Sequence, residues 1–282
     1  MISNVHCFAF QERIVSMYRW CARHGTLIIV FATAPLAVIL LICISQFGIP
    51  IWFALLFIFV MSVISSMFVN SCAKYLLLKA GKVLSEQCDP FALLKETEDQ
   101  LSYSLSKKYN QILLIDHCVS LRYIGEYEKV FAQLKAINID RYKKTSPVIK
   151  LIYYINLTDI HLCLNEIADA EMFQSKSLQL LQAIKNDKIK TIYLKTVNLN
   201  AAEILYFKQE YDGAADILSK VYCESLSTKV SKALLFAKIY IAQDKINEAR
   251  SELQFVVENG NKMIDVQIAR QLLSKIQTGI DF

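Results

Sequence analysis

The chain of 282 residues has a long stretch without any ionisable side chain, since no Asp, Glu, Lys, Arg or His occurs between Gly25 and Ala73. As one helix rising about 1.5 Å per residue, this stretch would extend roughly 73 Å, more than twice a bilayer core of about 30 Å. Gly48 and Pro50 in its middle favour a reversal of the chain. The sequence therefore predicts a transmembrane helical hairpin over residues 26–73, with helices at 26–46 and 51–71.

Two other interpretations of this apolar stretch are disfavoured. A hairpin buried in a soluble core would leave some polar residues on its exposed faces, and this stretch is apolar all round. A cleaved signal peptide has a shorter apolar core, starts nearer the N-terminus and is not followed by a second span. We therefore expect an integral membrane protein.

The turn between the two predicted spans lacks Lys and Arg, whereas both outer flanks are basic. The flanking basic residues are Arg13, Arg19 and Arg23 before the first span and Lys74, Lys79 and Lys82 after the second. Because basic residues favour the cytoplasmic side, we expect both termini in the cytoplasm, with the plasma membrane as the site of anchoring. Residues 1–25 then form a cytoplasmic N-terminal segment.

The eight cysteines include no CxxC pair. In a reducing cytoplasm, free buried thiols are the usual state of such residues. Cys21 and Cys72 flank the predicted membrane region, and the alternative interpretation for these two is palmitoylation.

Short sequence motifs of common nucleotide-binding and catalytic sites are also missing. The chain contains no GxxxxGK[ST], GxGxxG, HExxH or GxSxG. His117 and His161 lie next to or near cysteines, but they occupy helix-packing positions, so we expect no metal. Charge beyond residue 90 is nearly balanced, which disfavours nucleic acid as a partner. The only dense basic run, "RYKK" at 141–144, is predicted to be a solvated loop, with contact to acidic lipid head groups as the alternative. We expect neither an enzyme nor a cofactor.

Helical signals dominate the part of the chain after the hairpin. Asp89-Pro90 and Ser146-Pro147 each place an N-cap residue before a proline at the first helical position. No proline follows Pro147, and strand-like alternation is scarce. Residues 263–277 carry apolar side chains at every fourth position, at Ile264, Ile268, Leu272 and Ile276. The fold class is therefore predicted to be all-α.

Four segments share one pattern: "GEYEKVFAQL" (125–134), "NEIADAEMFQ" (165–174), "QEYDGAADIL" (209–218) and "DKINEARSEL" (244–253). Their third residues are large and apolar, namely Tyr127, Ile167, Tyr211 and Ile246. Their sixth residues are small or medium, namely Val130, Ala170, Ala214 and Ala249. Seven residues before each start stand Cys118, Thr158, Ala202 and Ala237. Small residues at these positions let two helices approach closely, and four matches in one register indicate repeats.

This pattern resembles the tetratricopeptide repeat, a helix–turn–helix unit of about 34 residues. The resemblance covers roughly residues 111–260, and the four starts are 35 to 44 residues apart, so it implies longer helices or loops in the first repeats. It implies an α-solenoid of about four repeats over residues 111–282, closed by a capping helix at 263–277. Residues 74–110 would form a linker and a lead-in helix.

In arrays of this family, the first helix of each repeat lines the groove that binds partners. The resemblance places in this groove Ile115, Val119, Arg122, Tyr123, Asp159, Glu203, Tyr206 and Lys238, together with Ile155, Leu199, Leu234 and Ile241. The alternative is that several of these side chains pack on an adjacent helix. The function that the resemblance implies is a membrane-anchored scaffold or adaptor for cytoplasmic proteins or peptides. A structural subunit of a membrane export or envelope assembly complex, or an enzyme with an unrecognised site, are the alternatives.

Overall fold

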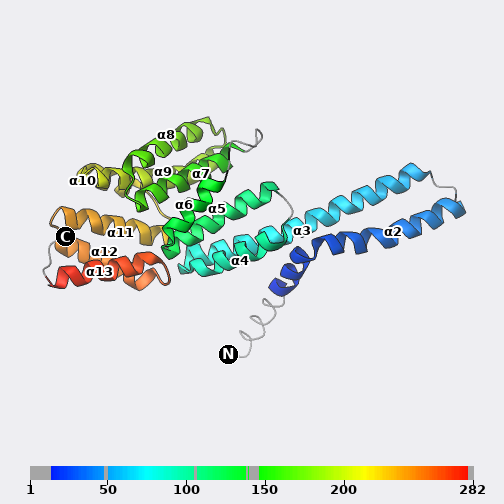
Figure 1. Cartoon of the computed structure of the whole chain (residues 1–282), viewed down its shortest axis with the longest axis horizontal. Helices are drawn as coiled ribbons and strands as arrows, with labels where there is room; N and C mark the ends of the chain where they lie inside the picture. The colour runs from blue at the N-terminus through cyan, green and yellow to red at the C-terminus, as the bar shows by residue number, and fades with distance from the viewer. Residues whose placement is uncertain (1–13, 48–49, 105–106, 138, 140–145, 279–282) are drawn as a thin grey trace, which may run out of the picture. The chain divides into compact units, whose positions relative to one another are not determined.

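The computed structural model describes residues 14–47, 50–104, 107–137, 139 and 146–278. Every regular element in these ranges is a helix, which confirms the all-α class (Figure 1). The "RYKK" segment and residues 48–49 of the turn between the two spans lie outside the described residues. The chain divides into two compact units, one up to Ala80 and one from Gly81 onward.

The N-terminal unit contains the apolar helices. Helical residues 14–23 precede α2 (Gly25–Phe47), and α3 runs from Ile51 to Gln87. Both α2 and α3 are long and apolar enough to cross a membrane, and almost no residue in the most apolar stretch of each helix is buried. The second helix does not end at Ser71 as its span was predicted to, but continues to Gln87. It continues because the residues after Ser71 contain no proline and are mostly good helix formers.

Close contacts join the cytoplasm-facing ends predicted for the two spans. A Cβ added at Gly25 would lie 2.5 Å from a methyl group of Val69, so glycine permits this approach. Tyr18 and Tyr75 pack edge to face with ring centroids 4.9 Å apart, and both Cys21 and Cys72 are buried. These contacts fix the base of the hairpin on residues outside its apolar middle.

Within the residues that the structure describes, the C-terminal unit contains the end of α3 and ten further helices. They are α4 (Pro90–Tyr103), α5 (Lys107–Ile124), α6 (Tyr127–Ala136), α7 (Pro147–Cys163), α8 (Ile167–Ala183), α9 (Asp187–Phe207), α10 (Tyr211–Lys220), α11 (Leu226–Ala242), α12 (Ile246–Asn259) and α13 (Ile264–Thr278). The two predicted caps are confirmed, since Asp89 accepts a hydrogen bond from the Phe91 amide at 3.1 Å and Ser146 accepts one from the Val148 amide at 3.3 Å. Both helices then start with proline, whose missing N–H needs no partner there.

The same turn occurs four times, each time between the two helices of a pair. The four pairs are α5 with α6, α7 with α8, α9 with α10, and α11 with α12. Each turn has one residue with a left-handed backbone, and these are Gly125, Asn165, Gln209 and Asp244. The amide of the next residue then donates to the carbonyl five positions earlier, at distances of 2.8 to 3.0 Å. This is the hydrogen bond that closes a helix C-terminus in a Schellman motif. The four segments predicted from the sequence as equivalent corners each begin at one of these left-handed residues, which confirms their register.

Packing positions repeat in the same register. The residues predicted to be small contact points, which are Cys118, Thr158, Ala202 and Ala237 in the first helices and Val130, Ala170, Ala214 and Ala249 in the second, are at most 1% exposed. In the second pair Gln174 takes the place that leucine has in the other three. Its side-chain amide donates to the Val197 carbonyl at 2.7 Å, so its buried nitrogen is paired.

The first helices of the four pairs and α13 contact one another in a closed series. Helix α5 contacts α7, α7 contacts α9, α9 contacts α11, α11 contacts α13, and α13 contacts α5 again. The turn before α13 is also held to the start of α4, because the Lys262 amide donates to the Cys88 carbonyl at 3.2 Å and the Lys262 ammonium lies 2.6 Å from Asp89. Five helices therefore face a common centre.

Gly125 lies where the series closes. Its φ of 93° favours glycine, and an added Cβ would lie 3.0 Å from the Ile264 side chain of α13. The other three turns carry side chains at φ values of 58° to 65°. Gly125 is thus required both by its backbone and by the close approach of α13.

We predict that Gly125→Ala lowers the free energy of unfolding by about 1–2 kcal/mol from the left-handed backbone alone, and further through the clash with Ile264. Gly213→Ala is the matched control, because its Cβ would meet only Leu205 at 3.5 Å inside α10. That change should stabilise the chain by about 0.5–1 kcal/mol, since alanine restricts the unfolded backbone. Urea unfolding of the full chain in detergent, followed by circular dichroism, measures both. Equal effects of the two changes would contradict the close approach at Gly125.

Candidate functional site

The inner faces of the five helices enclose a cavity of about 180 Å³. Its lining combines charged, hydroxyl and short aliphatic side chains. They include Arg122, Tyr123 and Tyr127 from the first pair, Asp159 and Cys163 from α7, Leu199, Asn200 and Glu203 from α9, Ser231, Leu234 and Lys238 from α11, and Asp265 and Ile268 from α13. Cys163, which also lines the cavity, has solvent-accessible surface.

One ion pair crosses the cavity wall between α5 and α7. Arg122 Nε lies 3.4 Å from Asp159 Oδ2, and the guanidinium sits 4.2 Å from the centre of the Tyr123 ring. Both side chains are mostly buried, at 22% and 12% exposed. Burial raises the pKa of Asp159, although Arg122 and a hydrogen bond from Asn200 act in the opposite direction. Asp159 is therefore held in a poorly hydrated place where its ionisation is unfavourable.

Glu203 and Lys238 bring a second negative and a second positive charge to the cavity, from α9 and α11. Burial raises the pKa of Glu203, and the nearby charges of Asp159 and Asp265 raise it further. Lys238 and Arg122 partly offset this effect. The two charges act on each other through space, yet they form no direct ion pair among the described residues.

Asp265 at the start of α13 supplies the third carboxyl group. It is buried, and its Oδ2 accepts a hydrogen bond from the Ser231 hydroxyl at 2.8 Å. Burial raises the pKa of Asp265, against the effects of Ser231, Arg122 and Lys238. Sequence analysis missed this residue. A single acidic residue between Ile264 and Val266 gives no periodic signal.

The predicted groove residues divide into two groups. Arg122, Tyr123, Asp159, Glu203 and Lys238 are brought together around the cavity, as are Leu199 and Leu234. Ile115 lies instead in a buried cluster between the first two helix pairs, at 2% exposed, and Ile155 is buried between α7, α8 and α9.

Three more of those residues are not part of the cavity lining. Tyr206 packs on Phe207 and Tyr211, with ring centroids 5.4 and 5.9 Å away. Val119 is half-buried, and Ile241 packs against the cluster of α11, α12 and α13. The groove that the resemblance implied therefore does not include Val119, Tyr206 and Ile241 in the lining of the cavity.

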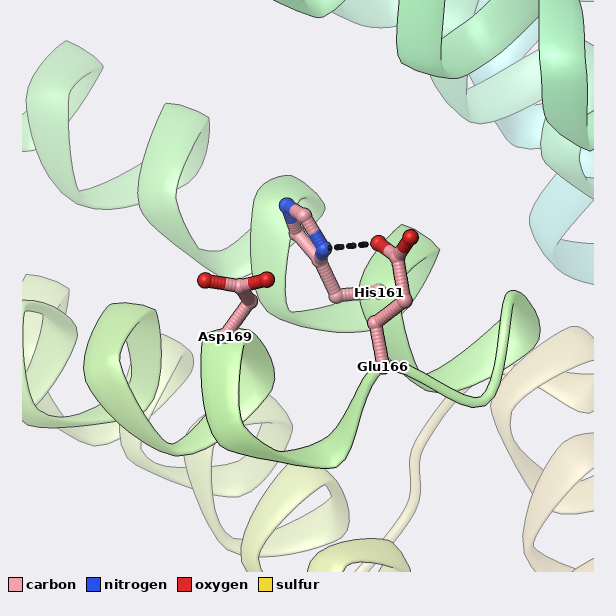
Figure 2. A group of neighbouring side chains, drawn as sticks. All are labelled: His161, Glu166 and Asp169. Atoms are coloured by element: carbon pink, nitrogen blue, oxygen red, sulfur yellow. Dashed lines mark hydrogen bonds and ion pairs between the residues drawn. The ribbon is translucent and has the colours of Figure 1, made fainter.

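A second cluster lies at the turn between α7 and α8. Figure 2 shows the His161 imidazole with Glu166 on one side and Asp169 on the other. The ligand atoms of the three lie within 4.8 Å of one another, so these residues could hold a metal ion. His161 Nδ1 lies 2.6 Å from Glu166 Oε2, which is a hydrogen-bond distance, and the ring packs 5.1 Å from Phe173. As it stands, the cluster provides a partner for a buried histidine, and a metal would have to displace this bond.

No protein-family model matches the chain, and no curated protein or solved structure matches it either. What the cavity can bind therefore follows from its own residues. Two cations and three carboxyl groups surround short aliphatic side chains, and such a lining suits a small polar group that carries charge.

The raised pKa of Glu203 predicts a pH-dependent stability. A carboxyl group whose pKa is higher in the folded state than in the unfolded state stabilises the fold less as the pH rises through that window. Glu203→Gln should therefore be more stable than the native chain at pH 7, and the difference should shrink towards about pH 4, near the pKa of an unperturbed Glu. The measurement is the urea midpoint of the full chain in detergent at both pH values.

Glu248→Gln on α12 is the control for this measurement, since its side chain is exposed. It should shift the midpoint little at either pH. A native chain that is more stable than Glu203→Gln at pH 7 would show that Glu203 is stabilising when ionised, against this prediction.

Proposed function

We propose that this chain is a membrane-anchored adaptor whose helical repeat domain binds a partner protein in the cytoplasm. The observation that carries the proposal is the fourfold turn between paired helices, combined with two helices of membrane-spanning length. Paired helices joined by one repeated turn, with small residues buried at repeated positions, are the build of tetratricopeptide-like solenoids. Such solenoids serve mainly to present a surface to other proteins.

The anchor rests on the exposed apolar side chains of α2 and the first part of α3. A helix that is apolar on all sides is stable where lipid covers it. Basic residues flank both helices, and the turn between them has none, so we infer that both termini face the cytoplasm. The repeat domain would then be held close to the inner face of the membrane.

The partner would contact the mouth of the cavity rather than its interior. A helix with its side chains is about 10–12 Å wide, and a cavity of about 180 Å³ holds only part of one turn. A side chain or a chain end of the partner can reach inside, whereas its main contacts lie around the opening. Cys163, which lines the cavity and has accessible surface, is a residue to which a crosslinking reagent can be attached.

We predict that a membrane-impermeant maleimide does not label Cys163 in intact cells and labels it after permeabilisation. Of the six cysteines that the structure describes, Cys163 alone is exposed. Cys7 and Cys43 lie outside the described side chains, so both are changed to Ser in every variant. Burial raises the pKa of the Cys163 thiol to about 12, so its labelling is slow and is followed over time. Gln46→Cys in a Cys163→Ser background is the control, because Gln46 lies at the end of α2 next to the turn. That residue should be labelled from outside. The opposite pattern would contradict the orientation.

Photocrosslinking tests the adaptor role itself. A photoreactive maleimide attached to Cys163 in permeabilised cells should yield a crosslinked product with a distinct partner protein. The matched control is Ser175→Cys in a Cys163→Ser background, since Ser175 is exposed on α8 and is not part of the cavity lining. The product should be absent or different there. Crosslinking only to lipid, or an identical protein product from both positions, would count against binding at the mouth of the cavity.

A further inference from the structure

Two opposite charges in the central cavity have no direct partner. Neither the Glu203 carboxylate nor the Lys238 ammonium forms a hydrogen bond or an ion pair with any residue that the structure describes. Both side chains are partly buried. A charge withdrawn from bulk water without a partner is unfavourable, so each of these groups favours a bound counter-charge.

The remaining charges of the cavity are already engaged. Asp159 is paired with Arg122 at 3.4 Å. Asp265 accepts from Ser231 at 2.8 Å, and it lies in the first turn of α13, where the helix dipole favours a negative charge. The unsatisfied groups are therefore one of each sign.

The size of the cavity limits what can neutralise both groups. About 180 Å³ corresponds to roughly six water molecules at about 30 Å³ each. Sites for drug-sized ligands are larger, at about 300–1,000 Å³. Leu199, Leu234 and Ile268 form apolar parts of the wall, so a short hydrocarbon segment is accommodated between the charges.

We propose that the cavity binds a small zwitterion of amino-acid size, with its ammonium group on Glu203 and its carboxylate on Lys238. A small cation alone would leave Lys238 without a partner, and a small anion alone would leave Glu203 without one. This site does not depend on the adaptor role, because it requires neither the membrane anchor nor a partner protein.

The electrostatics of the unliganded cavity agree with this assignment. Burial and two neighbouring carboxyl groups raise the pKa of Glu203, so its ionised form is destabilised. An ammonium group in contact with it would lower that pKa again. Binding of a zwitterion therefore relieves an unfavourable interaction that is already present in the fold.

Isothermal titration calorimetry on the full chain in detergent tests the proposal at pH 7. Glycine, β-alanine and γ-aminobutyrate serve as zwitterionic probes with increasing separation of charge, and ethylammonium and propionate carry one charge each. At least one zwitterion should bind with a dissociation constant of about 1 mM or lower, and both single-charge probes should bind at least about tenfold more weakly, which is about 1.4 kcal/mol.

Two variants and two controls locate the site. Glu203→Gln and Lys238→Met should each raise the dissociation constant of the zwitterion by about tenfold or more. Circular dichroism should confirm that both variants remain folded. Glu248→Gln and Lys188→Met remove exposed charges of the same kind and should leave binding unchanged. The proposal is overturned if no zwitterion binds up to about 10 mM, if a single-charge probe binds as tightly, or if both cavity variants retain full affinity. The maleimide labelling and the photocrosslinking, which test the adaptor role, have results that are independent of these outcomes.

Discussion

The approach of α13 to the turn at Gly125 is the contact on which the C-terminal unit depends. Stacked helix pairs joined by identical turns form an open array unless the two ends meet. Here Ile264 occupies the space that a side chain at position 125 would fill. The closing helix then contributes Asp265 and Ile268 to the cavity, so the enclosure exists only because the first and last inner helices touch. This explains why glycine stands at one of the four corners while Asn165, Gln209 and Asp244 serve at the others.

Closure has an electrostatic consequence. It gathers five charged side chains from five helices around one small volume, in which water is scarce and charges interact strongly. The pKa values of Asp159, Glu203 and Asp265 are all raised by burial. A core built only for stability would carry apolar residues at such places, since replacing buried ions by well-packed apolar side chains is often neutral or stabilising. Perturbed groups that line a cavity are instead typical of a binding or reactive site. The uneven pairing of these charges therefore indicates recognition more than structural support.

The repeat register and the two long apolar helices could be predicted because their signals are local. A left-handed residue, a large apolar residue two positions later and a small one three positions beyond that recur within each corner. The charges of the site were also visible, since Asp159, Glu203 and Lys238 each directly follow one of the buried small residues of the first helices. Closure was not predictable, because it brings together residues 125 and 264, which are far apart in the chain. Asp265 was missed for the same reason, and Ile115 was placed in the groove although it is buried between the first two helix pairs.

The closing helix also connects the cavity to the end of α3. The carbonyl of Gln87, the last residue of α3, accepts a hydrogen bond from the Asn261 side chain at 2.7 Å, and the Cys88 carbonyl accepts one from the Lys262 amide at 3.2 Å. Both donors belong to the turn that precedes α13. The segment after α3 and the turn before the helix that bears Asp265 are thus held together by two hydrogen bonds, and the one between the Lys262 amide and the Cys88 carbonyl joins backbone atoms. Helices α7 and α9, which carry Asp159 and Glu203, contact their neighbours in the series and have no such bond to the α3–α4 junction among the described residues. One wall of the cavity is therefore fixed to the chain that leads to the apolar helices, while the opposite wall is fixed only by packing within the repeats.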